Sequence, residues 1–170
     1  DGYGEPSSTV IDCAQPSGYA ETDDDCDDTD SAIHPDASEI CDGIDNDCDE
    51  DIDDDDTTID LSTATTFYTD LDTDGYGDPS TAVSFCTAPS GSVTDGSDCD
   101  DSDIAVNPAA TEVCDGIDND CNDDIDDEDA ALDTTTASNW YPDADADGYG
   151  DSMAAATLAC DLSGTCLLYT

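Results

Sequence analysis

The sequence predicts small irregular tandem repeats stabilised by disulfides, with short β-hairpins plus short helical turns, little regular secondary structure and a small core. One offset of 73 residues relates four cysteines to four others, from Cys13, Cys26, Cys41 and Cys48 to Cys86, Cys99, Cys114 and Cys121. The tetrapeptide Asp-Gly-Tyr-Gly keeps the same period and begins at Asp1, Asp74 and Asp147. Self-similarity at a fixed period is the signature of a repeat architecture.

Composition explains why so little regular structure is expected. The chain has 48 acidic residues and no Lys or Arg, and Leu, Ile, Val and Phe together number 23 of its 170 residues. Below about 20% of these apolar residues, a highly charged chain ordinarily stays disordered, because it buries too little surface to offset the entropy of ordering. Ten cysteines, eight of them related by the 73-residue offset, argue against a simple acidic tail.

The absence of cationic side chains excludes several classes of partner and activity. Nucleic acid and anionic membranes would be repelled by a chain with 48 acids and no Lys or Arg. No base, nucleophile or oxyanion donor recurs between repeats, and the position equivalent to the single histidine, His34, is Asn107. We therefore expect that the protein is not an enzyme.

The repeats and their connectors follow from the 73-residue offset. Repeat 1 spans residues 1–56 and is incomplete at its N-terminus, repeat 2 spans 67–129, and repeat 3 spans 140–170 and is incomplete at its C-terminus. Residues 57–66 and 130–139 are Ser/Thr-rich connectors.

Each repeat is predicted to open with a β-hairpin. A short aromatic strand, Phe67-Tyr68 or Trp140-Tyr141, enters an Asp-rich turn. The extended, partly alternating stretch 80–86 then leads to the first cysteine of repeat 2. Strand, turn and strand indicate a small hairpin.

A helical turn is predicted after the second cysteine. Asn107-Pro108 places an N-cap before a proline, and Gly116 is positioned to end the helix. His34 stands at the position of Asn107, and we interpret it as a cap or surface residue. The expected small core comprises Ile40, Ile44, Val113 and Ile117.

The cysteines predict disulfides and an oxidising compartment. No C-x₂-C spacing is present, which disfavours zinc and iron–sulfur sites. Four cysteines permit three connectivities, so the pairing rests on a preference for short loops. It predicts the bonds Cys13–Cys26, Cys41–Cys48, Cys86–Cys99, Cys114–Cys121 and Cys160–Cys166.

Alternating aspartates form a first acidic loop in each repeat. Calcium takes about six to eight hard oxygen ligands, commonly from loop positions 1, 3, 5, 7, 9 and 12, with Gly at position 6. The repeat 2 loop supplies Asp70, Asp72, Asp74, the Tyr76 carbonyl and Asp78, with Gly75 at position 6. The repeat 3 loop supplies Asp143, Asp145, Asp147, Tyr149 and Asp151, and repeat 1 keeps Asp1 and Glu5.

A second acidic loop surrounds the fourth cysteine of each full repeat. Its candidate ligands are Asp45, Asp47, Asp49, Asp53 and Asp56 in repeat 1, and Asp118, Asp120, Asn122, Asp126 and Asp129 in repeat 2. Position 6 is Glu50 or Asp123 rather than Gly, so this turn is expected to differ from that of an EF-hand. EF-hand loops are flanked by long amphipathic helices, and the sequence has no apolar periodicity that predicts such helices.

A third acidic cluster flanks the second cysteine. It contains Asp25 and Asp27 in repeat 1 and Asp98 and Asp100 in repeat 2, with Asp28, Asp30, Asp101 and Asp103 nearby. It either completes one of the other sites or holds its own ion. The expected cofactor is Ca²⁺, at roughly two to three ions per repeat. The predicted repeats are therefore stabilised by calcium as well as by disulfides.

These motifs resemble those of a known family. Asp-Gly-Tyr-Gly-Asp, Asp-Cys-Asp-Asp and Cys-Asp-Gly-Ile-Asp-Asn-Asp-Cys are similar to the MopE-type repeat, a metal-binding module of large secreted bacterial surface proteins. The acidic loops also resemble thrombospondin type 3 repeats. The resemblance covers nearly the whole chain and implies an extracellular, calcium-dependent spacer or adhesive module. The founding member of the family is associated with copper, which one unrepeated histidine supports little.

The sequence therefore predicts an extracellular or cell-surface structural protein whose tandem array is folded and rigidified by calcium. One alternative is a self-assembling filament or surface-layer subunit, in which Asp1 and Glu5 pack head to tail against residues 160–170 of another copy and share a calcium ion. A second alternative is an acidic calcium store or mineral-binding matrix protein. The expected partners are calcium and, in the first alternative, other copies of the chain.

Overall fold

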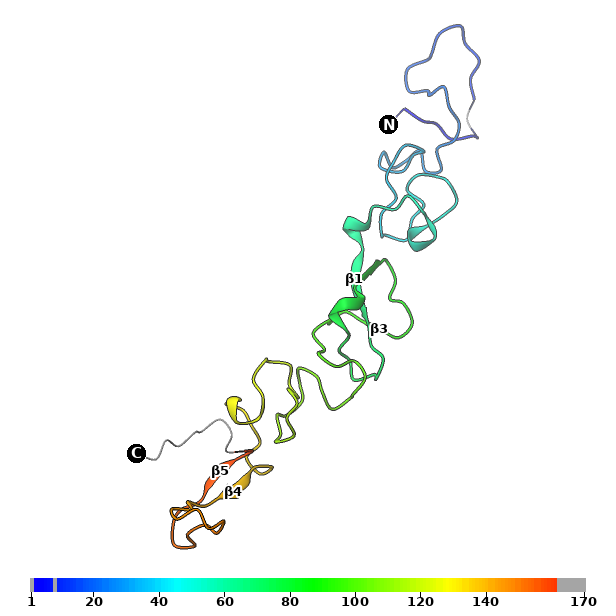
Figure 1. Cartoon of the computed structure of the whole chain (residues 1–170). Coiled ribbons are helices and arrows are strands. Elements are labelled where there is room, and N and C mark those ends of the chain that lie inside the picture. Colours follow the sequence, from blue (N-terminus) through cyan, green and yellow to red (C-terminus); the bar gives the residue numbers. More distant parts are fainter. Residues whose placement is uncertain (1, 8, 162–170) are drawn as a thin grey trace. The chain divides into compact units, whose positions relative to one another are not determined.

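The computed structural model describes residues 2–7 and 9–161, and Figure 1 shows that loops make up most of this ribbon. The strands are β1 (Thr65–Thr69), β2 (Val83–Phe85), β3 (Ser92–Val93), β4 (Ser138–Trp140) and β5 (Thr157–Ala159). Single 3₁₀ turns are η1 (Asp53–Asp55), η2 (Leu61–Thr63), η3 (Pro79–Thr81) and η4 (Asp126–Glu128). The described residues contain no α-helix, which confirms the prediction of an irregular fold with little regular secondary structure. Nothing in them is a helix long and apolar enough to cross a membrane.

The chain divides into two compact units, and the predicted hairpins form in both. Unit 1 comprises residues 1–67 and 82–94, and unit 2 comprises residues 68–81 and 95–170. Strand β1 pairs antiparallel with β2, placing Thr65 opposite Phe85, in a sheet of order β2-β1-β3. Strand β4 pairs antiparallel with β5, placing Trp140 opposite Thr157 (Figure 1). Phe67 and Tyr68 lie in β1 and Trp140 lies in β4, as predicted, whereas Tyr141 follows the end of β4.

The predicted helix at Asn107 stops after one turn. The Asn107 side chain accepts the backbone N–H of Ala109 at 3.0 Å, and its carbonyl accepts that of Ala110 at 2.9 Å, so the cap forms. The next residues are not helical. A continued helix would have to recover the cost of nucleation over few residues, and here the chain instead directs Glu112 into the interior.

The interior is mostly polar. Only Ile33, Phe67 and Val106 are buried hydrophobic residues in the described part of the chain, whereas eight polar or charged side chains are buried: Asp25, Glu39, Asn46, Asp56, Asp98, Glu112, Asn119 and Asp129. The predicted core is therefore wrong in part: Ile44 is 46% exposed and Ile117 is 45% exposed, while Ile40 and Val113 are half-buried. Hydrogen bonds and carboxylates occupy the space that an apolar core would otherwise fill.

The predicted disulfide pairing is wrong. The bonds are Cys26–Cys48, Cys41–Cys86, Cys99–Cys121 and Cys114–Cys160. Cys13 is an exposed free thiol. Cys166 lies outside the described residues, and its predicted partner Cys160 is bonded to Cys114.

Backbone hydrogen bonds explain why the short pairs do not form. Between Cys41 and Cys48 the chain wraps around the buried Asn46, whose side chain accepts the backbone N–H of Ile40 at 3.0 Å. Cys48 is thereby turned toward Cys26, whose backbone N–H lies 3.1 Å from the Cys48 sulfur. The prediction based on short loops did not take into account the path of the chain around Asn46.

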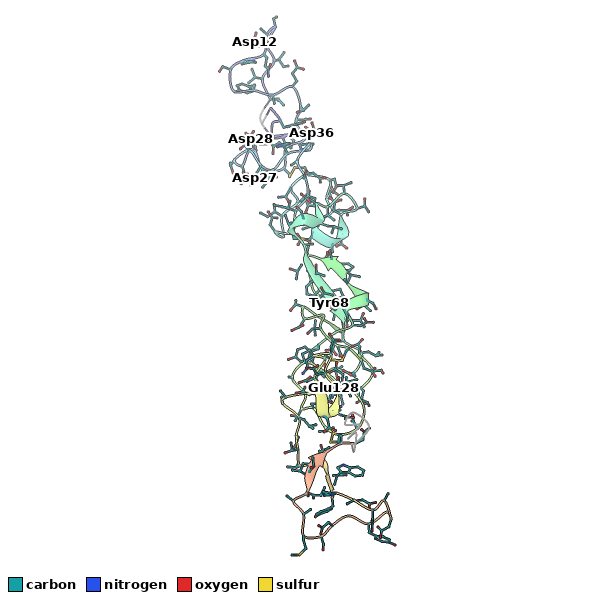
Figure 2. All side chains as sticks on the ribbon, turned by 60° about the vertical axis from the view of Figure 1, so that its left-hand side comes forward. Asp12, Asp27, Asp28, Asp36, Tyr68 and Glu128 are labelled. Atoms are coloured by element: carbon teal, nitrogen blue, oxygen red, sulfur yellow. A yellow bond between two sulfur atoms is a disulfide. The ribbon has the colours of Figure 1, made fainter. Side chains whose placement is uncertain are left out.

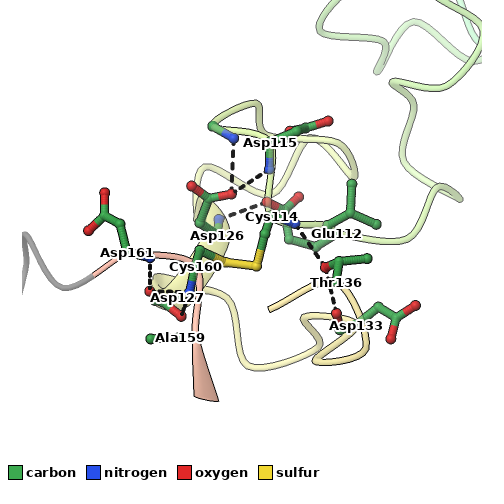
Figure 3. Close-up of a disulfide and its surroundings, with 12 residues drawn as sticks. Glu112, Cys114, Asp115, Asp126, Asp127, Asp133, Thr136, Ala159, Cys160 and Asp161 are labelled. Carbon is green, nitrogen blue, oxygen red and sulfur yellow. Dashed lines mark hydrogen bonds between the residues drawn. A yellow bond between two sulfur atoms is a disulfide. The ribbon is translucent and has the colours of Figure 1, made fainter. Parts of the chain in front are cut away.

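An acidic residue positions the longer disulfide in each repeat. Asp54 accepts the backbone N–H of Cys86 at 2.7 Å, which holds Cys86 beside Cys41. In unit 2, Asp127 accepts the N–H of Cys160 at 2.9 Å, next to Cys114 (Figure 3). These bonds span 45 and 46 residues, so each joins the core of one repeat to the hairpin of the next.

The Ser/Thr-rich connectors are hydrogen-bonded to the repeat cores. The Thr63 hydroxyl accepts the backbone N–H of Cys41 at 3.0 Å, and the Thr136 hydroxyl accepts that of Cys114 at 3.0 Å. Residues 57–66 and 130–139 are thus integrated with the modules they follow. Asp1 and residues 162–170, on which the predicted head-to-tail contact depends, lie outside the described residues.

Candidate metal centres

Four acidic loops share positive φ angles at two positions. They are residues 45–53 and 70–78 and, one repeat later, residues 118–126 and 143–151. Position 4 has a positive φ in every loop, at Cys48 (61°), Thr73 (69°), Cys121 (58°) and Ala146 (56°). Position 6 also has a positive φ, at Glu50 (78°), Gly75 (100°), Asp123 (73°) and Gly148 (90°). The first and second loops therefore share the turn at positions 4 to 6, whereas only the second loops have a positive φ at position 9, at Asp53 and Asp126 (both 51°).

The second loop lacks Gly at position 6, yet Glu50 and Asp123 adopt the same left-handed region as Gly75. A side chain in that region costs roughly 1–2 kcal/mol, and acidic residues tolerate it only moderately well. The loop geometry is therefore maintained at a local energetic cost in the second loops.

Hydrogen bonds from the loop backbone fix the carboxylates at positions 1 and 5. The position 1 oxygens of Asp45 accept the N–H groups of Asp49 and Glu50, both at 3.1 Å. The position 5 carboxylates accept the N–H two residues on, as Asp74 does from Tyr76 at 2.9 Å. The other oxygen of each position 5 carboxylate does not take part in this hydrogen bond and could bind a cation.

In repeat 2, two acids from the third cluster complete the first loop. Oxygens of Asp72, Asp74 and Asp98 lie within 4.8 Å of one another, as do oxygens of Asp70, Asp72 and Asp101. The backbone N–H of Asp98 donates to the Gly77 carbonyl at 3.2 Å, and that of Leu71 donates to Asp101 at 2.8 Å. Of the two roles predicted for the third cluster, the structure supports completion of the first loop.

The oxygens facing this centre have no hydrogen-bond donor. Asp98 is only 2% exposed, and the Oδ2 atoms of Asp72, Asp74 and Asp98 are buried without a donor from any described residue. Burial raises the pKa of Asp98 above its usual range, and the neighbouring charges of Asp74 and Asp72 raise it further. Burial is likewise the main cause that raises the pKa of Asp72. Grouped, desolvated carboxylates of this kind are compensated by a cation.

The second loop of repeat 1 forms another centre. Oxygens of Glu39, Asp45 and Asp47 lie within 4.8 Å of one another, and so do those of Asp47, Asp49 and Asp56. Asp47 Oδ1 and Asp56 Oδ2 are buried and accept no hydrogen bond from the described part of the chain. Burial is the largest cause that raises the pKa of Asp47, followed by the charges of Asp49, Asp56 and Glu39.

Glu39 closes this centre from outside the loop. It is fully buried, and its two oxygens accept the backbone N–H groups of Asn46 at 2.7 Å and Asp53 at 3.0 Å. Glu112 repeats this arrangement in unit 2, with Asn119 at 2.7 Å and Asp126 at 2.8 Å (Figure 3). The buried glutamate thus ties the two ends of the loop together.

A comparison with family models identifies the segments that carry these centres. Residues 25–54 and 98–127 each match the model Cu-binding_MopE, described as "Putative metal-binding motif". The chain carries two MopE-type metal-binding motifs. This confirms the MopE-type resemblance for these two segments, and the resemblance to thrombospondin type 3 repeats stays a prediction. Neither the curated proteins nor the solved structures yielded a match to the chain.

Some ligands of the centres lie outside the two MopE-type motifs. Asp56 and Asp129 follow the matched segments by two residues, and the hairpin loops 70–78 and 143–151 are not part of them. The hairpin-loop centre of repeat 2 therefore combines Asp98 and Asp101 from a MopE-type motif with aspartates that precede it.

Two ligand candidates inside the MopE-type motifs were missed by the sequence reasoning. Glu39 and Glu112 stand two residues before a cysteine at the 73-residue offset, and each is a lone glutamate among aspartates. That repetition was an available signal. Asp101, noted only as a neighbour of the third cluster, also joins a centre.

Several predicted ligands cap backbone turns in the structure. Asp53 Oδ1 accepts the N–H groups of Asp42 and Gly43, both at 3.0 Å, and Asp126 does the same in unit 2. Asp78 binds the amide and hydroxyl of Ser80, which lowers its pKa. Equivalent two-residue caps are made by Asp27, Asp100 and Asp151. Asp27 is an exposed residue (Figure 2).

The first loops of repeats 1 and 3 are less complete. In repeat 1, Asp1 lies outside the described residues and Glu5 is exposed, but Asp25 is buried and its N–H donates to the Gly4 carbonyl at 3.2 Å. In repeat 3, Asp143 caps the loop through Gly148 at 2.9 Å, while Asp145, Asp147 and Tyr149 are exposed.

His34 acts as the cap that the sequence suggests. Its Nδ1 accepts the backbone N–H of Asp36 at 3.3 Å, and its ring stacks on Tyr3 with a centroid separation of 5.2 Å. The Tyr3 hydroxyl donates to Asp36, which raises the pKa of Tyr3. The imidazole is therefore engaged away from the carboxylate centres.

Proposed function

We propose that this protein is an extracellular, non-enzymatic structural protein whose tandem repeats are folded by calcium. The observation that carries the proposal is the set of buried carboxylate oxygens without hydrogen-bond donors among the described residues: those of Asp25, Asp47, Asp56, Asp72, Asp74, Asp98 and Asp120. Two pairs of them, Asp25 with Asp98 and Asp47 with Asp120, are related by the 73-residue offset, and those of Asp47, Asp56, Asp72, Asp74 and Asp98 belong to groups of neighbouring carboxylates.

The chemistry of the donors favours calcium over copper, despite the name of the matching family model. The grouped ligands are hard carboxylate oxygens, which suit Ca²⁺, whereas copper prefers imidazole and sulfur donors. Eight cysteines are bonded in disulfides, and the single imidazole is engaged with Asp36 and Tyr3. Calcium also tolerates the high coordination number that four or five carboxylates provide.

The proposed mechanism is linkage between binding and folding. With three buried hydrophobic side chains in the described residues, the apolar contribution to stability is small. A cation that binds the folded centres but not the unfolded chain adds its binding free energy to folding. It also relieves the repulsion among the 48 acidic residues.

An extracellular location is supported by the disulfides. Four of them form among the described residues, and such bonds persist in oxidising compartments. A non-enzymatic role is supported by the absence of any repeated nucleophile or base in the sequence. The repeated features are turns, buried glutamates that join the two ends of a loop, and carboxylate centres.

The test is calcium removal followed by limited proteolysis. Trypsin is unsuitable because the chain has no Lys or Arg, so a protease that cleaves after acidic residues is required. We expect the calcium-loaded chain to resist cleavage and the chelated chain to be cut in both units. Copper at equal concentration should not restore protection. Unchanged cleavage and circular dichroism after chelation would refute the proposal.

A further inference from the structure

The second loops of the two repeats differ at one ligand position, Asp49 in repeat 1 and Asn122 in repeat 2. We infer that the two MopE-type motifs bind calcium with unequal affinity, so that the repeat 1 centre fills at lower calcium than the repeat 2 centre. The inference rests on the proposed calcium function and adds to it a fixed order of loading.

The two centres are otherwise closely matched. Glu39 and Glu112 are both buried and accept the same pair of backbone N–H groups. Asp45 and Asp118 accept the N–H groups of positions 5 and 6 in the same way. The difference in affinity is therefore expected to come from position 5.

Asn122 changes the partner of the last carboxylate in the loop. In repeat 1, Asp56 is 4% exposed and its Oδ2 has no donor among the described residues, so it is available to a cation. In repeat 2, the equivalent Asp129 accepts the side-chain N–H of Asn122 at 2.6 Å through its Oδ2. An internal hydrogen bond thus occupies the carboxylate that faces the ion in repeat 1.

Calcium binding in repeat 2 must break or rearrange this contact. The Oδ1 atom of Asn122 accepts the N–H of Asp124 at 2.7 Å. Rotating the amide to present oxygen to the ion would place its NH₂ group against that N–H donor. The repeat 2 centre therefore has one charge fewer and loses a hydrogen bond on binding. Because ligand charge count tunes calcium affinity, we expect it to be weaker by about tenfold or more.

Two reciprocal substitutions test the inference in the intact chain. Asp49→Asn makes the repeat 1 centre resemble that of repeat 2, and Asn122→Asp makes the reverse change. The backbone N–H groups of Gly43 and Gly116 report on each centre by NMR, because each donates to a loop carboxylate, Asp53 or Asp126, in the same way. A calcium titration then gives one midpoint for each repeat.

In the unmodified chain we expect the Gly43 signal to change at about tenfold lower calcium than the Gly116 signal. Asp49→Asn should raise the Gly43 midpoint by a similar factor, and Asn122→Asp should lower the Gly116 midpoint. If Asp49→Asn fails to fold, the Asn122→Asp result decides alone. Equal midpoints in the unmodified chain would overturn the inference and leave the calcium function intact. No response of either signal to calcium would overturn both.

Discussion

The hairpin loops of repeats 2 and 3 have the same local conformation but present their carboxylates differently. In residues 70–78, Asp72 and Asp74 are half-buried and their Oδ2 atoms lack donors among the described residues. In residues 143–151, the equivalent Asp145 and Asp147 are exposed. In repeat 2, Asp98 packs against the loop and lies beside Asp72 and Asp74.

This comparison separates loop formation from site formation. The loop is held by its own short-range hydrogen bonds, such as those from Gly75 to Asp70 and from Gly148 to Asp143. The buried centre requires a closing acid from outside the loop. In the hairpin loop of repeat 2 this acid is Asp98, and in the second loop of repeat 1 it is Glu39. Glu112 makes the same backbone hydrogen bonds in repeat 2.

The largest effect is expected where the closing acid is itself held by backbone N–H groups. Glu112→Gln replaces one accepting oxygen by an NH₂ group that faces an N–H donor, at a residue that is 1% exposed. We expect a loss of about 2–3 kcal/mol in the free energy of unfolding at saturating calcium. Denaturant titration measures it.

Glu128→Gln is the matched control, because Glu128 is an exposed residue of η4 in the same unit (Figure 2). It should change stability by no more than a few tenths of a kcal/mol. Equal effects of the two substitutions would mean that Glu112 contributes no more than its charge.

A smaller effect is expected for Asp98→Asn, which should make the repeat 2 loop behave like the exposed repeat 3 loop. Asp98 supplies a buried oxygen without a donor among the described residues, so its loss should weaken calcium binding more than folding. We expect the calcium midpoint of the Gly75 amide signal to rise by about tenfold or more, with that of Gly148 unchanged.

Asp100→Asn is the control for this substitution, because Asp100 is exposed and caps Ser102 through an oxygen that Asn also provides. If Asp100→Asn shifts the Gly75 midpoint as far as Asp98→Asn does, the closing role assigned to Asp98 is wrong.

The local parts of the fold were predictable from the sequence. The spacing of Asp70, Asp72, Asp74 and Gly75 determines the loop, because its hydrogen bonds join residues at most five positions apart. The hairpins followed from Phe67 and Trp140 for the same reason: strand residues flank one short turn.

The non-local parts were not predictable by the same reasoning. The two longer disulfides, Cys41–Cys86 and Cys114–Cys160, depend on Asp54 and Asp127, each of which accepts a backbone N–H more than 30 residues later. Glu39 and Glu112 lie outside the loops they close, so a pattern based on loop positions did not include them. Burial of acids in place of Ile44 and Ile117 also contradicts the usual rule that apolar residues form the interior.

A third prediction concerns the strained position 6 of the second loop. Glu50 has a φ of 78°, where the hairpin loops use Gly75. Glu50→Gly should stabilise the calcium-loaded fold by about 1 kcal/mol, because glycine adopts positive φ without strain. The neighbouring Asp51→Gly removes the same charge at a residue without a positive φ and should destabilise it. Thermal unfolding of the two variants gives shifts of opposite sign if the strain is real.

The smallest effect concerns the pH dependence of the metal-stripped chain. Burial raises the pKa values of Asp47, Asp72 and Asp98 above the ordinary value of 3.8. Their contribution to stability is therefore present below 3.8 and is lost as pH rises through their folded-state pKa. Protonation removes the repulsion that, in the proposed function, calcium compensates.

A second group of acids has the opposite dependence. Hydrogen bonds from hydroxyl and amide groups lower the pKa values of Asp27, Asp60, Asp78 and Asp133 below 3.8. Their contribution is present above 3.8 and is lost as pH falls through their folded-state pKa. The metal-stripped chain should therefore recover part of its structure on acidification from neutral pH and lose it again well below 3.8.

Circular dichroism of the metal-stripped chain between pH 7 and pH 2 tests this optimum, at low protein concentration because the pI is about 4.1. The calcium-loaded chain should show the opposite slope above the optimum, because protons displace calcium from the same carboxylates. Asp98→Asn removes one of the repelling charges, so it should reduce the amount of structure that the metal-stripped chain regains on acidification. A steady loss of structure from neutral pH downward, without a maximum, would show that the buried carboxylates do not limit the metal-free fold.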